Sequence, residues 1–179
     1  MTGRFIFLDF DGCVNNYAET PGSYATHLPD EYGPSFSNIE RLRNLAEECD
    51  AKIIISSNWR KFELSGPNSV WHHANGDYPN PLGKLYEQLG DLVYGSLPPY
   101  RHMLKSEVLI LWMEENDFDG QFVIFDDDPR EAFATTHDYS LCDHYIHVKS
   151  EFGITDADCK RAKKILMKDY EMKDYQMMG

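Results

Sequence analysis

Three short apolar runs that stop abruptly at polar residues constrain the fold of this chain most strongly. They are Phe5 to Leu8, which ends at Asp9, Ile53 to Ile55, which ends at Ser56-Ser57, and Phe122 to Phe125, which ends at Asp126-Asp127. A continuous apolar run of this length is typical of a strand buried on both faces of a parallel sheet. We predict that these runs form such a sheet, with Leu92 to Tyr94 and Tyr145 to Val148 as weaker candidate strands.

Helical patterns separate the runs. Ser37 and Glu40 have capping-box spacing, and apolar residues then recur every three or four positions, at Ile39, Leu42, Leu45 and Cys49. A second helix is predicted over Lys105 to Glu115, and a last helix opens at Thr155. Strands that alternate with helices favour an α/β fold with a doubly wound sheet.

The chain has the size and composition of one globular domain over residues 1–179. It has 179 residues, 42% of them hydrophobic and 13% aromatic, and contains no repeat or Pro/Gly-rich linker. Two stretches, 15–36 and 61–81, fit no regular element. Because long loops in a compact domain usually serve function, we expect them to be substrate lids or binding loops.

The charge and the N-terminal pattern limit the partners. With 17 basic and 30 acidic residues, the net charge of −13 repels polyanions and disfavours extensive nucleic-acid binding. The four cysteines are scattered without a metal-ligand spacing, which favours reduced thiols. The apolar run at the start is too short for a signal peptide or a membrane span, so we expect a cytoplasmic protein without a membrane partner.

The first strand run leads into Asp9-Phe10-Asp11-Gly12. Ligands of open α/β sheets bind at the carboxyl ends of the strands, so both carboxylates can face one crevice. One carboxylate can attack an electrophile while the other transfers a proton, and Gly12 permits a sharp turn. The alternative is an ordinary turn after an edge strand, where Asp and Gly are common.

The third strand run leads into Asp126-Asp127-Asp128. Three adjacent acids repel one another unless a cation or solvent relieves them, and carboxylates with water and phosphate oxygens suit Mg²⁺. We predict a metal site here. The alternative is a solvated acidic loop, and the sequence does not decide which of the three acids binds the metal.

The second strand run leads into Ser56-Ser57-Asn58, whose hydroxyl and backbone N–H groups can hold phosphate oxygens. Lys105, at the start of the predicted second helix, can offer a positive charge to phosphate or to an acidic nucleophile. Each of these signals is weak alone. Together with the acidic segments they supply the groups that one phosphoryl-transfer reaction needs.

The segments FIFLDFDG, IIISSN, Lys105 and FVIFDDD, in this order, resemble the four motifs of the haloacid dehalogenase (HAD) superfamily. The details are most similar to the HAD domain of Swiss Army Knife RNA repair proteins. That resemblance rests on Ser57-Asn58-Trp59-Arg60, on Lys105-Ser106-Glu107-Val108 with Trp112, and on Phe152-Gly153-Ile154-Thr155. It implies a HAD-like Rossmannoid three-layer fold with a central parallel sheet and a minimal or absent cap domain.

The resemblance also implies roles for individual residues. Asp9 is the expected nucleophile, and Asp11 the expected acid and base. Ser57, or Ser56 in its place, would bind the phosphoryl oxygens beside Asn58, with Lys105 steadying the intermediate. Mg²⁺ would be held by Asp9, the backbone carbonyl of Asp11 and Asp127, with Asp126 behind them.

We therefore expect a Mg²⁺-dependent phosphomonoesterase that acts on a small phosphorylated metabolite or nucleotide. Trp59 and Arg60 follow the second motif and are candidate contacts to the substrate's leaving group. The alternatives are a polynucleotide 3′-end phosphatase, phosphoryl transfer to an acceptor other than water, and a non-catalytic domain that binds Mg²⁺ or a phosphorylated partner.

His144 and His147 lack a ligand-spaced third partner, so we assign them surface or packing roles. The oligomeric state is left open.

Overall fold

The structure of the chain is a computed structural model that describes residues 1–15, 34–58, 70–73, 76–79, 81–100, 102–129 and 141–168. Its centre is a five-stranded sheet in the order β5-β2-β1-β6-β7. The strands are β1 (Arg4–Leu8), β2 (Ala51–Ile55), β5 (Val93–Ser96), β6 (Gln121–Asp126) and β7 (Tyr145–His147). All neighbouring pairs in this sheet are parallel, which confirms the predicted parallel sheet.

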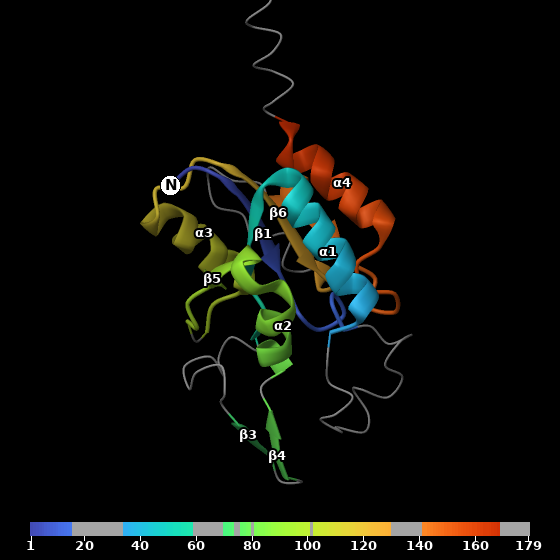
Figure 1. Cartoon of the computed structure of the whole chain (residues 1–179). Helices are drawn as coiled ribbons and strands as arrows, with labels where there is room; N and C mark the ends of the chain where they lie inside the picture. The colour runs from blue at the N-terminus through green and yellow to red at the C-terminus, as the bar shows by residue number, and fades with distance from the viewer. Residues whose placement is uncertain are drawn as a thin grey trace, which may run out of the picture.

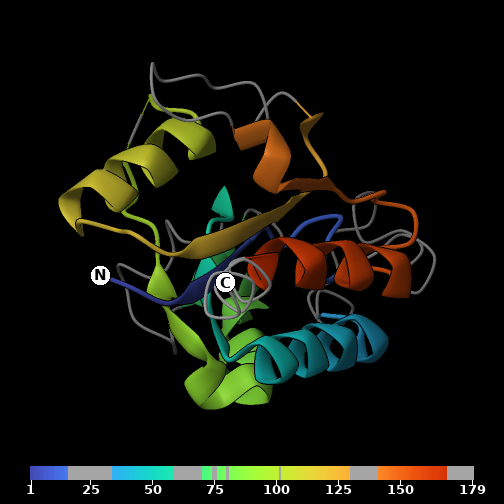
Figure 2. The same cartoon turned by 90° about the horizontal axis from the view of Figure 1, so that it is seen from above.

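The helices cover both faces of the sheet (Figure 2). On one face lie α1 (Phe36–Cys49), α2 (Pro81–Leu89) and α4 (Asp156–Leu166), and on the other lies α3 (Lys105–Glu115). Two short 3-10 helices, Gly90–Leu92 and Leu141–His144, precede β5 and β7. The result is a three-layer α/β fold.

Two apolar cores follow from the alternation of side chains along the strands. Ile6 and Leu8 of β1 pack with α1, α2 and α4, whereas Phe5 and Phe7 pack with α3. Trp112 of α3 makes edge-to-face contacts with both phenylalanine rings, at centroid distances of 5.8 and 5.6 Å. Burial on both faces explains why the central strands are continuous apolar runs.

The structure corrects the predicted start of the first helix. The N-cap of α1 is Ser35, whose hydroxyl accepts a hydrogen bond from the Asn38 backbone N–H at 3.4 Å. Ser37 and Glu40 therefore lie inside the helix, and the predicted capping box there is wrong. A side-chain hydroxyl two residues earlier can cap equally well, so spacing alone could not locate the helix start.

The structure also corrects the predicted loop 61–81. Its second half contains β3 (Val70–His73) and β4 (Gly76–Pro79), an antiparallel pair, and α2 begins at its last residue. This pair lies beyond the carboxyl ends of the sheet strands (Figure 1). The predicted lid residues 16–33 and 61–69 lie outside the described residues. Within the described part of the chain, no helix has the length and hydropathy needed to cross a membrane.

Candidate active site

The chain changes direction across the sheet between β1 and β6. From β1 it continues outward to β2 and β5, and it then returns to build β6 and β7 on the other side. Leu8 pairs with Phe125 of β6 and with Ile55 of β2, so the next residues, Asp9, Asp126 and Ser56, lie at one level at the carboxyl ends of three adjacent strands. The ladder extends to these residues, because Asp9 N–H donates to the Phe125 carbonyl at 2.9 Å and Ser56 N–H donates to the Leu8 carbonyl at 2.8 Å. Such a switch point is where open α/β sheets bind ligands.

Lys105 bridges the carboxylates of Asp9 and Asp126, at the carboxyl ends of β1 and β6. Its Nζ lies 2.9 Å from Asp9 Oδ2 and 2.6 Å from Asp126 Oδ2. The three side chains are 11%, 7% and 2% exposed, so the ion pairs are shielded from water. Burial alone would lower the pKa of Lys105, but the neighbouring charges of Asp9 and Asp126 raise it above its ordinary value. Lys105 therefore stays positively charged in this site.

Asp9, Asp126 and Asp127 form a group that could hold a metal ion. One carboxylate oxygen from each lies within 4.8 Å of the others. Burial and the charge of Asp9 raise the pKa of Asp126 above its ordinary value and that of Asp127 to about 6, and Lys105 only partly offsets this. Carboxylates held this close favour a divalent cation, because the cation removes their mutual repulsion.

Gly12 lets the loop after β1 pass directly against Asp127. Its φ is +71°, a conformation that favours glycine. An ideal Cβ at this position would overlap the Asp127 carboxylate and lie 2.8 Å from the Ser150 Cβ. The glycine of the first motif is therefore required both by its backbone conformation and by the closeness of the acidic turn after β6.

Asn15 holds the side chain of Asp11. Its Nδ2 donates to Asp11 Oδ1 at 3.1 Å, and its Oδ1 accepts a hydrogen bond from the Gly12 backbone N–H at 3.0 Å. Asn15 is 3% exposed. The sequence reasoning missed this residue, although its distance of four residues from Asp11 in a tight turn was a usable signal.

The loop after β1 packs against Asn38 and Gly153. Asn38 is fully buried, and its Nδ2 donates to the Val14 carbonyl at 3.4 Å, while Arg41 donates to its Oδ1 at 3.2 Å. A Cβ on Gly153 would overlap Asn38 and lie 2.7 Å from the Cys13 carbonyl. The Phe152-Gly153-Ile154-Thr155 segment thus supports the loop that carries Asp9 and Asp11. The sequence pattern gave Asn38 no role of its own.

The residues after β2 lie beside this cluster. Ser56 and Ser57 are buried and Asn58 is exposed. Ser56 shares a small cavity with Lys105 and Asp126 on the α3 side of the sheet. Trp59 and Arg60, the candidate contacts to the leaving group, lie outside the described residues.

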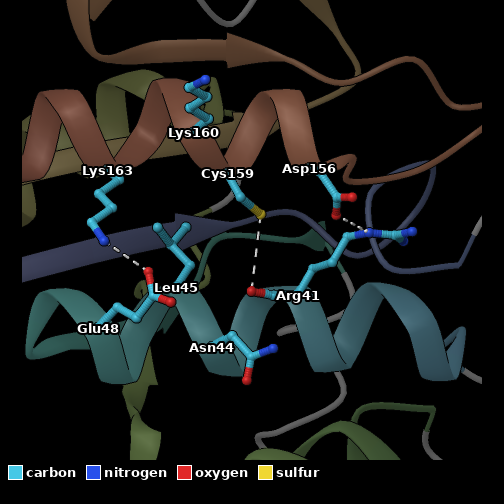
Figure 3. A pocket seen from close by; sticks show the side chains of 8 residues that line it. All are labelled: Arg41, Asn44, Leu45, Glu48, Asp156, Cys159, Lys160 and Lys163. Atoms are coloured by element: carbon cyan, nitrogen blue, oxygen red, sulfur yellow. Dashed lines mark hydrogen bonds and ion pairs between the residues drawn. The ribbon is translucent and has the colours of Figure 1, made fainter.

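A larger hollow of about 300 Å³ lies away from these acids, between α1 and α4 (Figure 3). The ion pairs Arg41–Asp156 and Lys163–Glu48, with N–O distances of 2.7 and 2.9 Å, connect the two helices there. In this pocket Cys159 points toward α1, where its Sγ donates to the Arg41 carbonyl (Figure 3). Since opposite charges already pair in this hollow, we assign it to helix packing.

The comparisons with known proteins give one match. A protein-family model described as the HAD domain in Swiss Army Knife RNA repair proteins matches residues 5–159. This range covers most of the chain, from β1 into α4, and includes every acid of the cluster. No curated protein and no solved structure matches the chain.

Proposed function

Because the chain belongs to the family of HAD domains found in Swiss Army Knife RNA repair proteins, we propose that it is a Mg²⁺-dependent phosphomonoesterase with Asp9 as the nucleophile. The observation that carries this proposal is the placement of Asp9. Its buried carboxylate lies 2.9 Å from Lys105 Nζ and within the three-carboxylate group of Asp126 and Asp127. A nucleophile for phosphorus and a binding site for a cation thus coincide at one carboxylate.

The residues present suit Mg²⁺. The donors are carboxylate oxygens, which this hard cation prefers, and they follow two neighbouring strands. Asp9 and Asp127 would hold the ion together with the backbone carbonyl of Asp11, and Asp126 would support them through Lys105. When bound, Mg²⁺ supplies positive charge that offsets the repulsion between Asp9 and a phosphate dianion.

The first half of the proposed reaction forms a bond from an Asp9 carboxylate oxygen to phosphorus. The bond from phosphorus to the leaving oxygen breaks, and Asp11 donates its proton to that oxygen. In the second half, Asp11 takes a proton from water while the water oxygen bonds to phosphorus. The bond from Asp9 to phosphorus then breaks, which returns both aspartates to their starting states and releases inorganic phosphate. Asn15, which donates a hydrogen bond to the Asp11 carboxylate, would orient that side chain for both proton transfers.

Lys105 and the residues after β2 are proposed to bind the phosphoryl oxygens. Lys105 carries the positive charge next to Asp9, and Ser57 and Asn58 would donate hydrogen bonds. We favour Ser57 over Ser56, because Ser56 lines the small cavity on the α3 side of the sheet.

For the substrate class, we propose a small phosphorylated metabolite or a nucleotide. The net charge of −13 is unfavourable for long contacts with nucleic acid. A polynucleotide 3′-end phosphatase is the second candidate, and the family description, which names RNA repair proteins, favours it. A nucleic-acid end could bind through its terminal phosphate with few further contacts.

Phosphate release from p-nitrophenyl phosphate, with and without Mg²⁺, tests the proposal. We expect turnover that requires Mg²⁺ and that falls by at least about a thousandfold in Asp9→Asn. Asp91→Asn is the matched control, because it makes the same charge change at an exposed position at the amino end of β5. A panel of mononucleotides, sugar phosphates and 3′-phosphorylated oligonucleotides then distinguishes the substrate classes.

Two outcomes would replace the proposal. If wild type releases no phosphate from any member of the panel, the chain is a non-catalytic domain. If the phosphoryl group on Asp9 is discharged by a sugar phosphate and not by water, the chain is a phosphoryl transferase.

A further inference from the structure

Side chains of β7 hold the backbone of the acidic turn after β6. All three backbone carbonyls of residues 126–128 accept a hydrogen bond from Tyr145 or His147. We propose that Tyr145 and His147 are positioning residues that orient Asp126 and Asp127 and thereby set the affinity for the divalent cation. This inference rests on the proposed function, since it takes Mg²⁺ as the ligand of these aspartates.

Tyr145 joins the two ends of the turn. Its hydroxyl lies 2.6 Å from the Asp128 carbonyl and 3.1 Å from the Asp126 carbonyl. A phenol has one proton to donate, so the two carbonyls share it and the shorter contact is the main one. The ring is 7% exposed and belongs to the apolar core on the α3 side. A buried ring with a fixed hydroxyl can define the turn more rigidly than water would.

His147 holds the middle of the turn. Its Nε2 lies 3.1 Å from the Asp127 carbonyl. A carbonyl only accepts hydrogen bonds, so Nε2 must carry the proton in this contact. The side chain is exposed, which separates its role from that of a core residue. The role assigned from the sequence, at the surface or in packing, misses this contact.

The alternation of side chains along β7 explains why these two residues act together. Tyr145 and His147 are two positions apart and point to the same face of the sheet, while Ile146 between them packs into the opposite core. The sheet pairing adds a third restraint, because Val148 N–H donates to the Asp126 carbonyl at 3.0 Å. With the backbone fixed, the Asp126 carboxylate reaches Lys105 and the Asp127 carboxylate lies against Gly12. Asp126 and Asp127, although adjacent in the chain, therefore contact different partners.

The test is direct measurement of cation binding to the full chain by isothermal titration calorimetry with Mg²⁺, and by electron paramagnetic resonance with Mn²⁺. Tyr145→Phe keeps the buried ring and removes only the hydroxyl. We expect its dissociation constant for Mg²⁺ to rise about three- to tenfold. His147→Ala should weaken binding similarly, and His147→Gln, whose amide can replace the Nε2 donor, should recover most of the loss. Extra Mg²⁺ should restore the kcat of Tyr145→Phe.

Two control variants separate positioning from general stability. Tyr94→Phe removes a hydroxyl from an exposed tyrosine of β5 whose ring packs on Phe5. His144→Ala removes a histidine that contacts the Phe122 carbonyl at 2.9 Å, at the other end of β6. We expect His144→Ala to lower the melting temperature, and both controls to leave the Mg²⁺ affinity unchanged.

The result that overturns the inference is unchanged Mg²⁺ affinity in Tyr145→Phe and His147→Ala while wild type binds the ion. Equal losses in the control variants would overturn it as well. In both cases the proposed function survives, because wild type still binds Mg²⁺. Absence of Mg²⁺ and Mn²⁺ binding by wild type would overturn the proposed function and this inference together.

Discussion

Replacing Gly12 by alanine has two effects: it strains the left-handed backbone conformation at this position, and it places a Cβ against the acidic turn at Asp127. Gly12 has a φ of +71°, and an added Cβ would overlap the Asp127 carboxylate and lie 2.8 Å from the Ser150 Cβ. Gly90 offers a matched control. Its φ is +54°, and nothing lies within 4 Å of an added Cβ there. Gly90→Ala therefore reports the backbone cost alone.

The expected magnitudes follow from these two environments. A left-handed backbone conformation costs an alanine roughly 1–2 kcal/mol, which both variants pay. Gly12→Ala adds an overlap cost of about 1–3 kcal/mol, because the Ser150 Cβ is attached to backbone and cannot rotate away. The Asp127 carboxylate can rotate away, but it then leaves the group that would hold Mg²⁺. We therefore expect Gly12→Ala to lose more stability than Gly90→Ala and also to lose cation binding.

Urea denaturation with and without Mg²⁺ measures both effects. At a Mg²⁺ concentration of about 100 times its dissociation constant, wild type should gain about 2.7 kcal/mol of unfolding free energy. If Gly12→Ala binds Mg²⁺ about fiftyfold more weakly, it should gain only about 0.6 kcal/mol at the same concentration. Gly90→Ala should keep the full gain. Equal Mg²⁺ stabilisation of both variants would refute the reasoning that Gly12 places Asp127.

Three further predictions concern charge and support in the site. Lys105→Met should lower kcat by at least about a hundredfold and destabilise the Mg²⁺-free protein by about 3–5 kcal/mol, because it leaves buried carboxylates without their cation. The folded-state pKa of Asp127, about 6 against an ordinary 3.8, means that its contribution to stability is present below pH 3.8 and lost as the pH rises through about 6. Stabilisation by Mg²⁺, measured from thermal unfolding, should therefore be larger at pH 8 than at pH 5, and this difference should shrink in Asp127→Asn. Asn38→Ala should cost about 1–3 kcal/mol in urea denaturation and also lower kcat, since it removes a buried donor to the loop after β1.

Control substitutions at exposed positions sharpen two of these tests. Lys163 forms an exposed ion pair with Glu48, so Lys163→Met should change neither kcat nor the midpoint of unfolding appreciably. Asn44 is exposed on α1, so Asn44→Ala should be close to wild type in both measurements. Losses in these controls as large as those in Lys105→Met and Asn38→Ala would contradict the assigned roles. A Mg²⁺ effect independent of pH would contradict the link to the Asp127 carboxylate.

The predicted strands and the main helices could be derived from the sequence because burial on two faces leaves a local signal. The runs at Phe5, Ile53 and Phe122 are continuous and apolar, and each lies within a strand of the central sheet. The elements that were missed lack this signal. The strands β3 and β4 form an antiparallel pair and α2 follows them, but proline, glycine and adjacent histidines in this part of the sequence are typical of a loop.

The sequence by itself determined which residues follow the strands and hence which chemical groups meet at one edge of the sheet. Asp9, Asp126 and Ser56 each come at the carboxyl end of a predicted parallel strand, and the carboxyl ends of parallel strands share one edge of a sheet. Only the tertiary structure decided how neighbouring aspartates differ. Asp126 pairs with Lys105, and Asp127 lies against Gly12. Side chains of β7 hold the backbone of the turn that contains both aspartates. These contacts join residues far apart in the chain, and three adjacent identical side chains carry no local information that could tell them apart.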